Sequence, residues 1–128
     1  MNLNEYFLLK LYWSQFTTSQ IHQFYRYYPH IFQMTPKEQE TSLLRWITHH
    51  HPMFLSKFHK YKQINIQEIM KILRQLHVKY ITCFDQGYPH LLKEIYDYPF
   101  VLFYKGDEKL FLSSQTLAIV GSRKCTHY

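Results

Sequence analysis

The sequence predicts an α/β protein in which a small all-helical domain at residues 1–76 precedes the beginning of an α/β domain at residues 77–128. The first observation is a change near residue 77 in the spacing of apolar residues, from helical to strand-like. The second is the run Leu117 to Val120, four apolar residues typical of a strand buried on both faces of a parallel sheet. The third is the content of only 3 glycines, which favours helices over loop-rich β structure.

Apolar stripes and capping residues predict the first two helices. Residues 5–13 form a helix with almost no polar face, so we expect it to be buried. Thr17, Thr18 and Ser19 are candidate N-caps of a second helix, which ends before Pro29. Its apolar stripe has the helical spacing i, i+3, i+4 and i+7 and consists of Ile21, Phe24, Tyr25 and Tyr28.

Three further helices follow in the amino-terminal domain. Thr35, Pro36 and Glu38 fit the N-cap, first-turn and capping-box positions of the third. Pro52 begins a fourth helix that extends to about Tyr61, and Asn65 caps a fifth. The side chains expected to face inward are Leu43, Leu44 and Ile47 in the third helix, Phe54, Leu55 and Phe58 in the fourth, and Ile66, Ile69, Met70, Leu73 and Leu76 in the fifth.

Five short helices within residues 4–76 fit a domain of the SAM or helix-hairpin-helix kind. The hairpins of the second kind usually place glycine in the turn that grips phosphate, yet residues 1–86 contain no glycine. A phosphate-binding hairpin is therefore not expected here. A role in protein contacts or in packing is the better interpretation of this domain.

Charge and cysteine content narrow the class of protein. The net charge is +6 with nine histidines counted as neutral, which favours a polyanion or an anionic surface as partner. No apolar run approaches the length of a membrane span and no signal peptide is evident, so we expect a cytoplasmic protein without a membrane partner. Cys83 and Cys125 lack C-x-x-C spacing and are expected to be reduced and unpaired.

Three consecutive histidines, His49 to His51, are a candidate metal site. Consecutive side chains point in different directions, and no Cys, Asp or Glu stands near them in the sequence to complete a coordination sphere. A solvated helix end, where histidine complements the helix dipole, is the better interpretation. We therefore expect no metal and no cofactor.

The second domain is predicted to begin with short strands and turns. Residues 80–84 have the composition of a strand and residues 85–89 that of a turn. A short helix at residues 90–95 leads through Pro99 to a second strand at residues 100–104. A turn at Lys105, Gly106 and Asp107 then precedes the strand Leu117 to Val120.

The end of that last strand has the composition of a phosphate site. Gly121 allows a tight turn and a close backbone approach to a ligand, while Ser122 and Arg123 add a hydroxyl and a planar cation with five donors. Backbone N–H groups and a helix N-terminus are expected next. A plain turn from strand to helix is the alternative. Neither G-x-G-x-x-G nor G-x-x-x-x-G-K-[ST] occurs, so dinucleotide and P-loop binding are not indicated.

Taken together, the stretches in residues 78–128 resemble the DprA/Smf family of DNA-processing proteins. The shared pattern is Tyr-Pro, Asp-x-Pro, a glycine and then Ala-Ile-Val-Gly-Ser-Arg, in that order. The matching residues are Tyr88, Pro89, Leu91, Leu92, Ile95, Asp97, Pro99, Leu102, Gly106, Ala118, Ile119, Val120, Gly121, Ser122, Arg123, Thr126 and Tyr128.

This resemblance implies a Rossmann-like domain that binds single-stranded DNA, with Gly121, Ser122 and Arg123 contributing DNA phosphate contacts. It implies no catalytic residues and no cofactor, hence no enzyme. It also implies a role in natural transformation, in which the protein protects incoming single strands and loads the RecA recombinase, and homodimers among full-length relatives. The family domain continues for well over a hundred further residues, so we expect this chain to be an amino-terminal fragment.

Two alternatives remain open on the sequence. A Rossmann-like nucleotide-binding or nucleotide-hydrolysing enzyme would hold a monophosphate at the Gly-Ser-Arg turn. Such an enzyme needs a general acid or base, and the nearest carboxylates, Asp107 and Glu108, have the pattern of turn residues. The other alternative is a protein-interaction module built from the helices alone.

Overall fold

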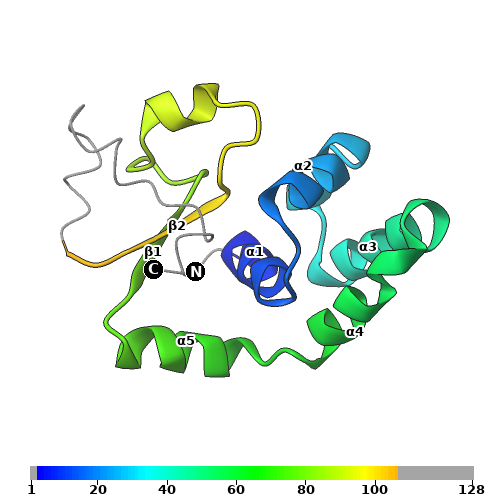
Figure 1. The fold of residues 1–128 in the computed structure, drawn as a ribbon, viewed down its shortest axis with the longest axis horizontal. Helices are drawn as coiled ribbons and strands as arrows, with labels where there is room; N and C mark the ends of the chain where they lie inside the picture. Colours follow the sequence, from blue (N-terminus) through cyan, green and yellow to red (C-terminus); the bar gives the residue numbers. More distant parts are fainter. Residues whose placement is uncertain (1–2, 107–128) are drawn as a thin grey trace. The chain divides into compact units, whose positions relative to one another are not determined.

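The computed structural model describes residues 3–106, and Figure 1 draws them as a coloured ribbon. The chain divides into two compact units at Glu68 and Ile69. We call the described part of the first, residues 3–68, the helical unit, and that of the second, residues 69–106, the ribbon unit. The domain boundary expected near residue 77 stays a prediction.

The helical unit contains four complete α-helices and two short 3-10 helices. Their bounds are α1 Leu3–Trp13, α2 Thr18–Tyr27, η1 Ile31–Gln33, α3 Pro36–His50, η2 Pro52–Phe54 and α4 Leu55–Gln63. Two of the predicted caps are confirmed here: Thr17 begins α2 and Thr35 begins α3, each in a capping box. The Thr35 N–H donates to Glu38 at 2.9 Å, and this bond holds the pKa of the Glu38 carboxyl below its usual value.

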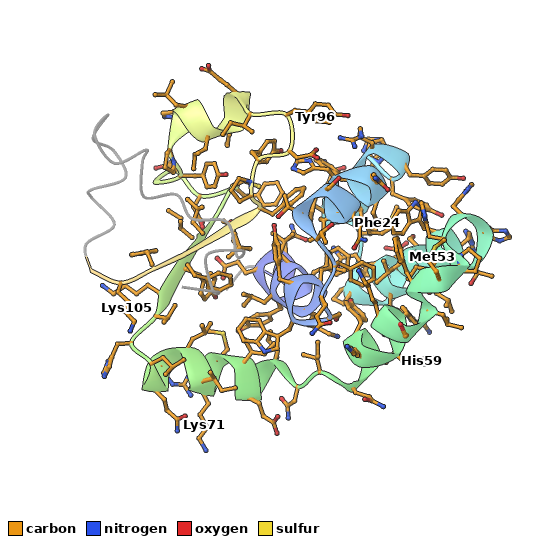
Figure 2. All side chains as sticks on the ribbon, viewed as in Figure 1. Phe24, Met53, His59, Lys71, Tyr96 and Lys105 are labelled. Atoms are coloured by element: carbon orange, nitrogen blue, oxygen red, sulfur yellow. The ribbon has the colours of Figure 1, made fainter. Side chains whose placement is uncertain are left out.

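Helix α1 is buried in the helical unit, as its lack of a polar face predicts. Leu8 and Leu9 are fully buried, and the ring of Phe7 lies 6.3 Å from that of Phe24 and 6.1 Å from that of Tyr61. Phe24, labelled in Figure 2, in turn lies 5.2 Å from the ring of Trp46 on α3. The core of this unit is therefore an aromatic cluster shared by α1, α2, α3 and α4.

Two of the side chains expected to be buried here are exposed. Leu44 is 39% exposed and Leu55 is 43% exposed, whereas Trp46 and Tyr61 take their places in the core. For Leu44 the reason is the helical rotation of about 100° per residue, which carries a side chain adjacent to buried Leu43 away from the apolar stripe.

A buried amide connects three elements of the helical unit. Gln39 on α3 is 2% exposed, and its Nε2 donates both to Asn4 Oδ1 at 3.1 Å and to the Ile31 carbonyl at 2.9 Å. Asn4 Nδ2 donates to the Phe32 carbonyl at 2.8 Å. Because each buried polar group has a partner, this network fixes α1, η1 and α3 in one arrangement.

Helices α1 and α5 both end in a left-handed residue that is not glycine. Helix α5 runs from Ile66 to Gln75 and is followed by His77 with φ 56°, while Gln15 follows α1 with φ 73°. At α5 the Val78 N–H donates to the Leu73 carbonyl at 2.9 Å, as in a Schellman motif. This turn explains why Leu76, expected to face inward, is 56% exposed: it lies beyond the end of the helix.

The ribbon unit continues into a two-stranded antiparallel sheet. Strand β1, Lys79–Thr82, pairs with β2, Val101–Tyr104, so that Ile81 lies opposite Leu102 and Thr82 opposite Val101. All four of these side chains are buried, although Ile81 and Thr82 point to opposite faces. Within the described residues, side chains on both faces of this two-stranded sheet are therefore buried at the end where β1 stops and β2 begins.

Between the strands lies η3, His90–Glu94, a 3-10 helix at the place where a short helix was predicted. The α/β class is thus confirmed at a coarse level: five α-helices and one small sheet occur within residues 3–106. The sheet seen there is antiparallel, and the parallel strand predicted at Leu117 to Val120 lies outside the described residues.

Candidate functional site

The predicted phosphate-binding residues Gly121, Ser122 and Arg123 lie outside the described residues, as does Cys125. The structure therefore describes the segment that leads to this site. Its elements are β1, the turn after β1, η3 and β2, which carry the first half of the family pattern.

A side-chain carboxylate holds the turn after β1. Asp85 Oδ2 accepts from the Thr82 N–H at 2.8 Å and from the Thr82 hydroxyl at 3.1 Å. The Thr82 hydroxyl also accepts from the Phe84 N–H at 3.3 Å. Since Thr82 is fully buried, these bonds satisfy polar groups that water does not reach. The turn is thereby fixed at the point where the chain leaves the sheet.

Two motifs of the family pattern meet through one hydrogen bond. Tyr88 of the Tyr-Pro motif is 1% exposed, and its hydroxyl donates to the carbonyl of Pro99, in the Asp-x-Pro motif, at 2.6 Å. The ammonium of Lys93 lies 5.8 Å from the centre of the Tyr88 ring. The described motif residues thus have a structural role: they close the η3 segment onto the start of β2.

Cys83 is a free, buried thiol, 3% exposed, at the end of β1. Its N–H donates to the Phe100 carbonyl at 2.9 Å and extends the ladder by one pair. Burial raises the pKa of this thiol to about 12, and the neighbouring charge of Lys93 opposes that effect only in part. The thiol is therefore protonated near neutral pH, which is typical of a small core residue and not of a nucleophile. The prediction that Cys83 and Cys125 are reduced and unpaired stays a prediction, because Cys125 lies outside the described residues.

The end of β2 is closed by a glycine in a conformation that suits no other residue well. Gly106 has φ 104°, and its carbonyl accepts from the ammonium of Lys79 at 3.1 Å. The family glycine thus turns the chain at the end of the described residues.

The three histidines are placed at a helix end, as predicted. His49 and His50 lie in the last turn of α3 and His51 is its C-cap residue. The ring of His51 stacks on that of Phe54 at 5.0 Å, whereas His50 lies 4.7 Å from Tyr27. Within residues 3–106, no three His, Cys, Asp or Glu side chains are grouped to hold a metal ion. The same residues include no helix long and apolar enough to cross a membrane.

The most basic element of the structure is α4, which carries Lys57, His59, Lys60 and Lys62 and no acidic residue. Lys62 forms an ion pair with Glu40 at 3.1 Å, and its side chain is 51% exposed. Nearby, the Lys10 ammonium lies 4.2 Å from the centre of the Tyr61 ring. Burial lowers the pKa of Lys10. The negative charge of Glu40 raises this pKa in part, and the positive charge of Lys62 lowers it further. Lys10 and Lys62 therefore lie close enough together for their charges to interact.

The sequence interpretation did not single out these lysines. The spacing Lys57, Lys60 and Lys62 within nine residues free of Asp and Glu was the available signal. It was overlooked because the positive charge of the whole chain is scattered.

Comparisons with known proteins show which proteins this chain resembles. Residues 79–128 match the family of DNA recombination-mediator protein A. The chain is 36% identical over 63 residues to DNA processing protein DprA of Bacillus subtilis, covering 49% of this chain and 21% of that protein. It is 32% identical over 94 residues to Protein Smf of Borreliella burgdorferi, covering 73% of this chain and 27% of that protein.

These matches confirm the resemblance to the DprA/Smf family and to DNA-processing proteins. The match to Protein Smf is longer than residues 79–128, so the similarity extends into the helices before β1. The chain spans 21% and 27% of the lengths of these two relatives. No solved structure matches the chain significantly.

Proposed function

We propose that this chain acts in DNA processing by binding single-stranded DNA without catalysing a reaction, and that RecA recombinase is its partner. The observation that carries the proposal is the match of residues 79–128 to the recombination-mediator family. The net charge of +6 is of the sign that a polyanionic ligand requires. The finer expectations, a Rossmann-like sheet and a cytoplasmic role in protecting incoming strands, belong to this proposal.

The Gly121, Ser122 and Arg123 turn is the proposed phosphate contact. Its support is chemical: a small turn residue, a hydroxyl and a guanidinium follow an apolar strand. The contacts of Tyr88 and Gly106 add support, because they show the preceding motifs folded as one connected unit. A guanidinium that contacts phosphate oxygens carries no base specificity.

Fluorescence anisotropy of a labelled oligo-dT, titrated with the full chain at several salt concentrations, tests the proposal. Arg123→Ala should weaken binding about equally for every DNA sequence, by about 1–3 kcal/mol, as for a charge-assisted hydrogen bond. The log–log salt slope should flatten by about 0.7. Arg123→Lys, which keeps the charge, should retain most of the slope.

Three outcomes would contradict the proposal. Saturable binding of a mononucleotide that matches or exceeds binding of the oligomer would instead favour the nucleotide-binding alternative. Absence of binding to either ligand would favour a helical interaction module. If circular dichroism shows that Arg123→Ala loses its fold, the residue is a structural ion-pair partner and not a phosphate contact.

A further inference from the structure

We draw no further inference here: the strongest candidate, the exposed apolar side chains of Leu91, Ile95 and Tyr96 along η3 and directly after it, carries no proposal because nothing in the described residues shows what covers them.

Discussion

Replacing Tyr88 by Phe removes one hydroxyl from a buried ring and leaves the shape of the ring unchanged. That hydroxyl donates to the Pro99 carbonyl at 2.6 Å, and it connects two segments that are eleven residues apart. A net hydrogen bond contributes about 0.5–1.5 kcal/mol, and a buried acceptor left without its donor costs about 1–3 kcal/mol. Since Pro99 is half-buried, water restores part of the loss. We therefore expect the free energy of unfolding to fall by about 1–2 kcal/mol.

Native-state hydrogen exchange followed by mass spectrometry localises this loss. A change of about 1–2 kcal/mol corresponds to exchange about 5–30-fold faster for amides that open through the affected unit. The faster exchange should appear in the peptides that contain β1 and β2. Peptides from α1 to α4 should change least, because they belong to the other compact unit.

Tyr96→Phe is the matched control, because Tyr96 is 77% exposed and water replaces whatever its hydroxyl contacts. Its exchange rates should equal those of the parent chain within about twofold. If Tyr88→Phe also leaves the ribbon peptides unchanged, the hydrogen bond does not hold η3 to β2. If instead all peptides exchange faster by the same factor, the two units unfold as one.

Two further predictions concern the left-handed residue after α5 and the thiol at the end of β1. His77→Gly should raise the free energy of unfolding, measured in urea, by about 0.5–1 kcal/mol, because glycine adopts φ 56° without the steric cost of a side chain. His77→Ala should give no such gain. An equal gain from both variants would refute the explanation. Cys83, whose pKa is raised to about 12, should react with iodoacetamide at pH 8 far more slowly in the native chain than in urea. Equal rates in the two states would show that the thiol is not buried.

The helices were predictable because their signals are local. The Thr35, Pro36 and Glu38 combination fixes the start of α3 within four residues, and the structure shows the expected reciprocal bonds. Sequence patterns were less reliable for which side chains are buried. Leu44 and Trp46 are both apolar and close in sequence, and only the direction of packing, which is set by distant elements, decides between them.

The sheet was predictable only in part. The positions of β1 and β2 follow from their composition, but their antiparallel pairing joins residues about twenty positions apart, and no local pattern encodes that register. The hydrogen bond from Tyr88 to Pro99 had no signal beyond the two motifs themselves.

The two-stranded ribbon has a consequence for the newly made chain. Helices α1 to α4 make mainly local contacts and can fold soon after they leave the ribosome. Within residues 3–106, β1 and β2 pair only with each other, so each has an outer edge without a strand partner. While such an edge is open, it is a template for pairing with a neighbouring nascent chain.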